Sequence, residues 1–594
     1  MHNSKVCEAR KAFQAKQYST ALKCYEKVAQ EIGEKFFKAN IKICKSQICK
    51  EPVNIVFICD ENYVIPTYVS IYSLVKNMDV NKKYNIFVVT NNLSKVSSSL
   101  FMGITCANVD ITIVCCSNKF DEFKINKKDF HVSTSAILKF ELPQLLNTID
   151  KVLYIDGDVI VQKDISEFFF TDIRDSYAGV IKDMKPILKY RPSVLTKLGI
   201  ETHDGYFNSG VLLLNLKKMR EDNITEMLFE YRKNGLNFFM DQDALNVVFG
   251  NKVKYFDLYF NTLMTLFEEF SIGQIKLYYG ISDSSKSVFD IIKKSYIIHF
   301  ASKNKPWNFD NKKFDGIWNR YFIRSNLFGL LEKGEKFNCK LINDVVVSLT
   351  SYPKRISTVH YTIETILNQS FKASKVILWL AEEQFPCREK ELPRSLLALK
   401  EKGLIISWCS DMKSYKKLIP ALKRYPKNII VTADDDILYH EHWLLELISS
   451  YISNPKAIHC HRSHYINIGK DGKPLSYRAW VRNCKNDENL LSFRNFFTGV
   501  GGVLYPPQSL SNDVFRKDLF MELCPSGDDI WFFGMALLQG TKIQRVTFSS
   551  FSLNFVEDTQ KTALHKMNDQ GGRNDIMLDR LICNYHQLIN IINE

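Results

Sequence analysis

Long apolar runs are missing from this chain of 594 residues, and none reaches the roughly 18–20 residues that a membrane-spanning helix needs. The first residues, from Met1 to Lys5, lead into a charged helical pattern without the apolar core of a signal peptide. Hydrophobic residues make up 45% of the chain and aromatic residues 13%, so extensive disorder is not expected either. These absences predict a globular protein that stays in the cytoplasm.

Metal-ligand spacing is missing among the cysteines. The fifteen cysteines are scattered, with Cys115 and Cys116 adjacent and with Cys59 and Cys106 inside apolar runs. Such a distribution is typical of reduced thiols in a protein core, and we expect reduced thiols here.

A basic block with interleaved aromatic residues is also missing, which argues against a nucleic-acid partner. The net charge is nevertheless +14, from lysines that are spread along the chain among acidic residues. This balance favours acidic partners such as nucleotide phosphates or an anionic lipid surface. Peripheral association with the inner face of the membrane is compatible with it.

The length exceeds what one hydrophobic core organises, so two or three domains are expected. Residues 1–50 are predicted to be helical, because alanines and apolar residues recur at helical spacing. The stretch 16–22 resembles part of a tetratricopeptide unit, but one copy cannot form a solenoid. We predict a helical hairpin that packs on the next domain, in preference to a peptide-binding module.

Two α/β regions are predicted to follow, at residues 51–335 and 340–594. The first opens with the apolar segment Val53–Cys59 and the second with Val345–Leu349, and both continue with alternating helical and strand patterns. Such alternation predicts mostly parallel, Rossmann-like sheets with helices on both faces. The fold class is therefore α/β, with two tandem domains of one architecture and little sequence in common.

The segment Lys151–Val161 carries the strongest chemical signal. Its apolar run predicts a buried strand that ends at Asp156 and Asp158. Ligands bind at the carboxyl ends of strands in open α/β sheets, and two carboxylates at this spacing can hold a hard divalent cation that holds a diphosphate.

Two other interpretations of this acidic pair stay open at this point. Its carboxylates could simply be solvated at a strand end. A phosphatase of the haloacid-dehalogenase type also places an aspartate pair after an apolar strand, although that strand usually opens the domain, and about 100 residues of α/β pattern come first here.

Further polar residues follow other predicted strands of the first region, lie in a small-residue turn at 208–210 that is paired with a strand, or precede the helical run at 244–246. An imidazole can be a third metal ligand, and a lysine can neutralise phosphate charge. The candidates are Asp60, Asn62, Asn208, Asp241, Gln242, His299 and Lys305.

With these motifs in this order, residues 53–310 resemble glycosyltransferase family 8, the retaining galactosyl- and glucosyltransferases of bacterial lipopolysaccharide synthesis, which have the GT-A fold. The resemblance implies that Asp156, Asp158 and His299 bind Mn²⁺ (or Mg²⁺) and, through it, a UDP-sugar. It implies contacts of Asp60 and Asn62 with the uridine and of Lys305 with the phosphates. Asn208, Asp241 and Gln242 would face the donor sugar, with Gln242 near the anomeric carbon.

Two positions depart from the family pattern. Ile137 stands where the family has an arginine that contacts the donor, and Lys139 is a candidate to compensate for it. Ser302 stands where the family has a glycine, three residues after the metal histidine.

The second region repeats the acidic strand end at Asp434-Asp435-Asp436. It resembles GT-A transferases of the family 2 kind, which are typically inverting and need a carboxylate base. The resemblance implies a metal at Asp434 and Asp436 and a base at Asp528 or Asp529. The histidines 459, 461 and 464 lie near these acids and are expected to line an acceptor site.

These patterns together predict a bifunctional, metal-dependent glycosyltransferase that moves galactose or glucose from a UDP-sugar. The expected acceptor is lipopolysaccharide, lipooligosaccharide or another lipid-linked surface glycan. The alternative is a single active family 8 domain followed by a degenerate domain that only binds the acceptor.

Overall fold

The computed structural model divides the chain into two compact units, Met1–Lys305 and Pro306–Glu594. The residues that it describes are 2–14, 18–32, 37–48, 51–91, 93–104, 106–116, 137–188, 192–200, 205–236, 238–239, 241–302, 305–308, 314–325, 327, 344–484, 490–546, 552–557, 559 and 572–594. None of the helices in these ranges is long and apolar enough to cross a membrane.

The amino-terminal segment contains three helices, where a two-helix hairpin was predicted. They are α1 (His2–Gln14), α2 (Tyr18–Ile32) and α3 (Lys38–Ile48). Their small core gathers Ala9, Ala21 and Tyr25, and the tyrosine ring lies 5.6 Å from the ring of Phe37. Alanines at these positions let the helices approach closely around one aromatic side chain.

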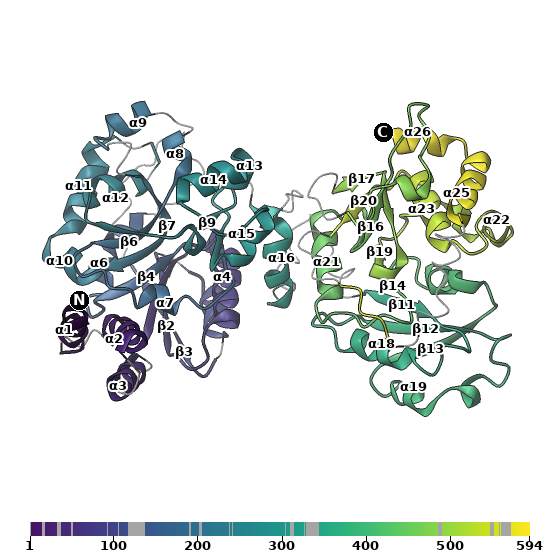
Figure 1. The fold of residues 1–594 in the computed structure, drawn as a ribbon, viewed down its shortest axis with the longest axis horizontal. Helices are drawn as coiled ribbons and strands as arrows, with labels where there is room; N and C mark the ends of the chain where they lie inside the picture. The colour runs from purple at the N-terminus through teal and green to yellow at the C-terminus, as the bar shows by residue number, and fades with distance from the viewer. Residues whose placement is uncertain are drawn as a thin grey trace. The chain divides into compact units, whose positions relative to one another are not determined.

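A seven-stranded sheet forms the centre of the first unit, in the order β3-β2-β1-β4-β7-β6-β8 (Figure 1). Its strands are β1 (Val53–Ile58), β2 (Tyr84–Thr90), β3 (Val109–Cys115), β4 (Lys151–Ile155), β6 (Ala178–Lys182), β7 (Phe207–Asn215) and β8 (Val253–Phe256). The strands from β3 to β4 are parallel, whereas β7 is antiparallel to both of its neighbours. Six of the seven strands therefore run in one direction, as the strand–helix alternation predicted, and β7 alone makes the sheet mixed.

The two faces of this sheet bury alternate residues of each strand. On β1, Ile55 and Phe57 face a core that includes α4, whereas Val56 and Ile58 face a core that includes α6 and α12. This two-residue period is what a strand covered on both sides requires. The helices of the unit are α4 (Val64–Asn77), α5 (Lys95–Met102), α6 (Leu138–Leu145), α7 (Ser166–Phe169), α8 (Met184–Leu188), α9 (Pro192–Lys197), α10 (Leu216–Glu221), α11 (Ile224–Asn234), α12 (Asp241–Phe249), α13 (Leu266–Glu269), α14 (Ile272–Tyr279) and α15 (Val288–Lys294).

A small second sheet, β5-β10-β9, continues from the end of β4. It contains β5 (Val159–Val161), β9 (Thr262–Leu263) and β10 (Ile297–His299). Pairing of Val159 with His299 brings the end of the unit back to its acidic strand end.

The second unit is built on an eight-stranded sheet in the order β13-β12-β11-β14-β19-β15-β20-β17. Its strands are β11 (Val346–Thr350), β12 (Lys375–Ala381), β13 (Leu404–Cys409), β14 (Ile430–Ala433), β15 (Ile458–Cys460), β17 (Leu491–Ser492), β19 (Val503–Tyr505) and β20 (Ile543–Arg545). A separate pair joins β16 (Ser463–Tyr465) to β18 (Asn495–Phe497). The helices are α16 (Asp315–Arg324), α18 (Val359–Leu367), α19 (Arg394–Ala398), α20 (Ile419–Arg424), α21 (Trp443–Ser453), α22 (Lys517–Leu523), α23 (Asp528–Leu538), α25 (Arg573–Asn584) and α26 (Gln587–Asn593).

The first seven positions of the two sheets follow one topology. In both, the first three strands along the chain occupy the same places, and the fourth carries the acidic end. In both, the next neighbour is antiparallel: β7 beside β4 and β19 beside β14. The outer pairs, β6·β8 and β15·β20, are parallel in both units. The domain limits predicted at residues 50, 335 and 340 stay predictions.

Gly502, the last residue before β19, lies against the buried ring of Trp443. Gly502 has φ +84°, and a Cβ there would lie 2.5 Å from Cζ2 of the fully buried Trp443. Trp443 cannot retreat easily, because its Nε1 donates to the carbonyl of Gly501 at 2.8 Å.

We expect Gly502→Ala to lower the free energy of unfolding of the second unit by about 2–4 kcal/mol, from backbone strain and overpacking together. All seven tryptophans follow residue 305, so tryptophan fluorescence during urea unfolding reports this unit alone. Gly403→Ala is the matched control: φ there is +104° and nothing lies within 4 Å, so only the backbone cost of about 1 kcal/mol remains. Equal losses in the two variants would contradict the packing argument.

Candidate functional site

The turn after β4 is fixed by packing against α4 and by the neighbouring strand. The amide of Asp156 donates to the carbonyl of Gly210 at 2.8 Å, across the antiparallel pair. The hydroxyl of Ser70 lies 2.7 Å from the carbonyl oxygens of both Gly157 and Val159. A Cβ on Gly157 would lie 2.3 Å from Oγ1 of Thr67, so the turn requires glycine between the two aspartates.

His299 completes a three-residue cluster with Asp156 and Asp158. Its Nε2 lies 3.2 Å from Oδ1 of Asp158 and 3.8 Å from Oδ2 of Asp156, and its side chain is 2% exposed. Among the residues that the structure describes, this is the one group of three carboxylate, imidazole or thiol groups close enough to share a metal ion. The geometry brings together the three metal ligands implied by the sequence.

An asparagine that the sequence analysis did not single out orients the imidazole. Nδ1 of His299 lies 2.9 Å from Oδ1 of Asn261, whose Nδ2 donates to Oδ1 of Asn208 at 2.8 Å. Because the amide oxygen can only accept, Nδ1 carries the proton and Nε2 is left to face the carboxylates. The only sequence signal for Asn261 was a polar residue that ends the apolar stretch 258–260.

Gly210 makes this close approach possible. A Cβ at this position would lie 2.2 Å from Cε1 of His299 and 2.7 Å from Oδ2 of Asp156. The residues Asn208–Gly210, expected to form a small-residue turn before a strand, lie inside strand β7, and Gly210 leaves room there for the cluster.

Lys305 neutralises one side of the cluster. Its Nζ lies 2.5 Å from Oδ2 of Asp158 and donates to the carbonyl of Phe300 at 2.9 Å. Burial by itself would raise the pKa of the Asp158 carboxyl, but Lys305 and His299 lower that pKa below its usual value. The lysine predicted to contact phosphate thus lies beside a predicted metal ligand.

Lys139 neutralises the other side, and the sequence suggested it only as a replacement for the missing arginine. Its Nζ lies 2.7 Å from Asp241 and 3.4 Å from Asp156, with the side chain 5% exposed. Burial would lower the pKa of this ammonium group, but the two aspartates raise it above its usual value. Ile137, at the position of the family's arginine, is buried in the core that contains α6.

Gln242 lies at the centre of a buried amide network. Its Oε1 accepts from Nδ2 of Asn208 at 3.0 Å and from the amide of Ser209 at 3.1 Å. Its Nε2 donates to Asp183 at 3.3 Å, and burial raises the pKa of the Asp183 carboxyl. Hydrogen bonds therefore connect His299, Asn261, Asn208, Gln242 and Asp183 in one continuous chain.

Two other acids have structural partners. Oδ1 of Asp60 accepts from the amides of Asn62 and Tyr63 at 3.0 and 3.2 Å, which starts the short helix after β1. Asp60 and Asn62 lie at the carboxyl end of β1, the neighbour of β4. Asp243, next to the candidate pair at 241 and 242, accepts from Tyr206 and from two backbone amides and holds the loop before α12.

The second unit contains a cavity of about 870 Å³ at the carboxyl end of β14. Its lining includes all the candidate acids of this unit: Asp434, Asp435, Asp436, Asp528 and Asp529. Of the three histidines considered in this region, His464 lines the cavity. His459 and His461 are held by Ser450 and by the backbone carbonyls of Asn454 and Trp443.

Lys417 lies among three of these acids. Its Nζ is 2.8 Å from Asp528, 3.2 Å from Asp434 and 3.8 Å from Asp529, and its side chain is 8% exposed. Burial would lower the pKa of Lys417, but Asp434 and Asp528 raise it well above its usual value.

Arg355 pairs with the other two acids of the strand end. Its Nη1 donates to Asp435 at 2.7 Å and lies 3.0 Å from Asp436. The predicted metal ligands Asp434 and Asp436 therefore contact two different cations, Lys417 and Arg355. Among the described residues, Asp434 and Asp436 do not belong to a group of three ligand atoms close enough to share a metal ion, unlike Asp156, Asp158 and His299.

Asp529 is the better placed of the two candidate bases. It accepts from the amide of Gly499 at 2.8 Å, in the small-residue loop noted in the sequence. Burial raises the pKa of Asp529 to about 7, Lys417 opposes that rise, and Asp528 adds to it.

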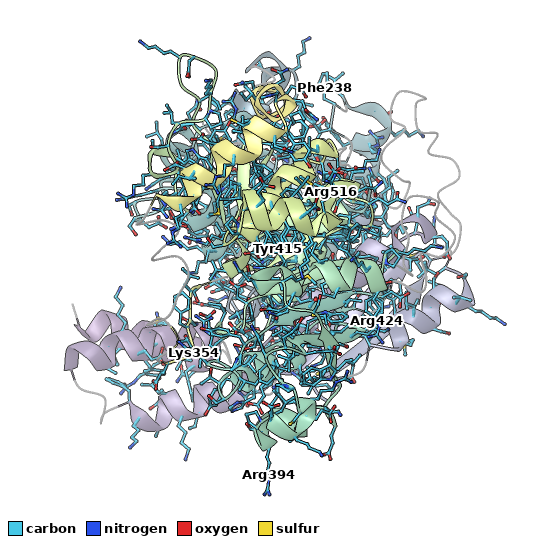
Figure 2. The ribbon with its side chains drawn as sticks, turned by 90° about the vertical axis from the view of Figure 1, so that its right-hand side faces the viewer. Phe238, Lys354, Arg394, Tyr415, Arg424 and Arg516 are labelled. Carbon is cyan, nitrogen blue, oxygen red and sulfur yellow. The ribbon has the colours of Figure 1, made fainter. Side chains whose placement is uncertain are left out.

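The position of Lys417 is fixed by its neighbour Tyr415, which lies in the interior of the second unit (Figure 2). The ring of Tyr415 stacks on Phe520 with centroids 4.1 Å apart, and its hydroxyl donates to the carbonyl of Cys524 at 2.7 Å. The carbonyl of Lys417 accepts from Ser348 at 2.6 Å. The short helix Lys413–Lys417 is thus held between α22 and β11.

Two carboxylates and an imidazole at the carboxyl edge of this sheet are suited to bind a metal ion, and sequence comparison gives the class of enzyme. Residues 54–311 match the sequence model of glycosyl transferase family 8. The chain therefore carries a family 8 domain and is a glycosyltransferase. The match decides against the phosphatase alternative for the acidic pair.

Two individual proteins are similar to part of this chain. The chain is 26% identical over 267 residues to the lipopolysaccharide 1,2-glucosyltransferase of Escherichia coli strain K12. This alignment covers 43% of this chain and 73% of that protein. Over 278 residues it is 24% identical to general stress protein A of Bacillus subtilis strain 168, covering 44% and 90%.

Two solved structures are also similar. The WbbM bifunctional glycosyltransferase matches with 24% identity and a TM-score of 0.39, over 46% of this chain and half of that one. The galactosyltransferase LgtC matches with 25% identity and a TM-score of 0.35, over 43% of this chain and 89% of that one. Both TM-scores lie below 0.5, so the family match carries the assignment.

Lys139 offers a test of the buried charge balance in the first unit. We expect Lys139→Met to lower its free energy of unfolding by about 3–5 kcal/mol, because the buried Asp241 and the partly exposed Asp156 lose their partner. Adding Asp241→Asn should recover part of this loss. Hydrogen exchange of β7 peptides in increasing urea measures the effect on this unit.

The control for that experiment is Lys83→Met, which breaks an exposed pair with Asp110 at 2.9 Å. Its expected cost is below about 1 kcal/mol. If Lys139→Met lowered the free energy of unfolding by as little as the control does, Asp156 and Asp241 would be well solvated without the lysine.

Proposed function

We propose that the first unit transfers galactose or glucose from a UDP-sugar, with retention of anomeric configuration and with a divalent metal ion. The single observation that supports this proposal most directly is the cluster of Asp156, Asp158 and His299, with Nε2 turned toward the carboxylates. Two carboxylates and one neutral imidazole are ligands that suit Mn²⁺, and Mg²⁺ would use the same oxygens.

The metal ion, when bound, supplies positive charge to the diphosphate of the leaving UDP. In this chain Lys305 supplies further charge on the same side, since its ammonium lies beside Asp158. Negative charge that develops on the departing nucleotide is thereby stabilised by fixed groups in a buried site.

The donor sugar is proposed to lie against Asn208, Asp241 and Gln242. Three hydrogen bonds hold Gln242 in one orientation, and Lys139 holds Asp241, so neither side chain must reorganise during transfer. Asp60 and Asn62 are proposed to contact the uridine from the end of β1. Lys139 takes the charge-balancing place of the arginine that Ile137 replaces.

The acceptor is proposed to be lipopolysaccharide, lipooligosaccharide or another lipid-linked surface glycan. The E. coli relative named above is a lipopolysaccharide glucosyltransferase, which supports this class of acceptor. The net charge of +14 is suited to peripheral association of a cytoplasmic enzyme with the anionic inner face of the membrane.

The second unit is proposed to be an inverting glycosyltransferase with a GT-A fold, which makes the protein bifunctional. The support is the strand order shared with the first unit, together with a cavity at the same edge of the sheet. Asp529 is proposed to take the proton of the acceptor hydroxyl, because the Gly499 amide holds its carboxylate and burial brings its pKa near neutrality. The competing hypothesis is a degenerate unit that only binds acceptor.

Asp156→Ala should reduce UDP release by the first unit at least about 1,000-fold, since a metal ligand is lost, while any activity of the second unit persists. A screen of UDP-sugars with released UDP as readout measures this. Asp110→Ala, an exposed aspartate outside the cluster, should leave turnover unchanged. Loss of both activities on Asp156→Ala would mean that the two units do not act independently.

Asp529→Asn should abolish activity of the second unit and leave that of the first intact. Because a base acts in its deprotonated form, the rate of the second unit should rise with pH and level off above about 7. The pH–rate profile of a chain carrying Asp156→Ala isolates this activity. A profile that is flat between pH 5 and pH 8 (a range of about three units) would exclude Asp529 as the base.

A further inference from the structure

The cavity of the second unit has an unusual charge arrangement. Five aspartates line it, and each lies within 4 Å of the ammonium group of Lys417 or the guanidinium group of Arg355. In the first unit, by contrast, the aspartates share a focus with an imidazole. The repulsion between neighbouring carboxylates is therefore offset by different groups at the two acidic strand ends.

Lys417 occupies the place where carboxylates of separate elements converge. It bridges Asp434 at the end of β14 with Asp528 and Asp529 at the start of α23. A bridge between a strand-end carboxylate and carboxylates of a later helix is a role that a bound cation can fill. Here a covalently tethered ammonium group fills it, held by Tyr415 and by Ser348.

Arg355 pairs with the two remaining aspartates of the strand end. It contacts Asp435 and Asp436 and donates to the carbonyl of Thr559 at 3.2 Å, so its planar group is fixed on three sides. Lys417 and Arg355 thus divide the strand-end carboxylates between two cations, and no three ligand groups among the described residues here lie close enough to share a metal ion.

Further basic side chains line the cavity besides Lys417 and Arg355. They are Lys413, Arg462, Arg482 and Lys416, and the Nζ of Lys416 pairs with Asp411 at 2.5 Å. A volume of about 870 Å³ accommodates a ligand of nucleotide-sugar size. Guanidinium and ammonium groups are the side chains that bind phosphate oxygens.

We propose that this cavity binds a nucleoside diphosphate ester without a divalent metal ion, with the ammonium group of Lys417 in the place of the metal. The inference rests on the proposed transferase function of the second unit. It replaces the metal site that the sequence placed at Asp434 and Asp436. One chain thus holds a metal-dependent site and a metal-independent one.

The test uses the full chain carrying Asp156→Asn and Asp158→Asn, which removes metal-dependent binding by the first unit. Inorganic pyrophosphate and UDP are titrated calorimetrically, once with excess EDTA and once with Mn²⁺. Pyrophosphate is included because it reports the charge site whatever base the natural ligand carries. We expect one equivalent to bind in EDTA, with an affinity that Mn²⁺ changes less than about threefold.

Lys417→Met in the same background should weaken binding in EDTA at least about tenfold, and Mn²⁺ should restore part of it because the freed carboxylates can then hold the ion. Lys400→Met, at an exposed lysine paired with Glu389, is the matched control and should bind as the parent does. Should Lys417→Met fail to fold, Arg482→Gln at the cavity wall is the second variant and should weaken binding severalfold.

The outcomes separate the two proposals. Binding that requires Mn²⁺ would overturn the metal-independent site and leave a second transferase standing. Absence of any pyrophosphate or UDP binding, with and without Mn²⁺, would overturn both. Binding in EDTA that Lys417→Met and Arg482→Gln leave unchanged would place the ligand elsewhere and overturn the inference.

Discussion

The balance of charge at the tips of two buried strands is the constraint on which the rest of this structure depends. Each tip brings several aspartates into a space that water reaches poorly, where unpaired carboxylates would be very unfavourable. In the first unit Lys139 and Lys305 stand on either side of Asp156 and Asp158, and the third neighbour is an imidazole. In the second, Lys417 and Arg355 carry the whole compensation. The choice of compensating group decides what chemistry remains available at each tip.

The shared strand order shows why the two tips are comparable at all. The antiparallel neighbour of the acidic strand, β7 in one unit and β19 in the other, brings small residues to the carboxylates. In the first unit Gly210, inside β7, approaches His299, and in the second the loop before β19 brings the amide of Gly499 to Asp529. The shared strand order thus brings glycine backbone to the acidic end of the fourth strand in both units. The side chains that later elements add there differ between the units.

Sequence patterns anticipated the parts of this arrangement that depend on local order. Apolar runs predicted β1, β4, β11 and β14, and the acids that follow them were predicted as site residues because strand ends are where ligands bind. The mixed pairing of the sheets was not predicted, since the direction of β7 is set by partners distant in sequence. Asn261 and Asp183 were missed for the same reason: each is a single polar residue whose role exists only once β7 is in place. Lys417 is one of several lysines after β13, and only the fold shows it among three aspartates.

The pairing of β5 with β10 has a consequence for how the enzyme is made. Val159 leaves the ribosome long before its partner His299, and the imidazole can join the two aspartates only when this non-local pairing forms. Until then the carboxylates at 156 and 158 lack both the imidazole and Lys305. During synthesis, therefore, the cluster of the first unit is completed last. A chain released before residue 299 would contain the strands of the sheet but not the imidazole or Lys305.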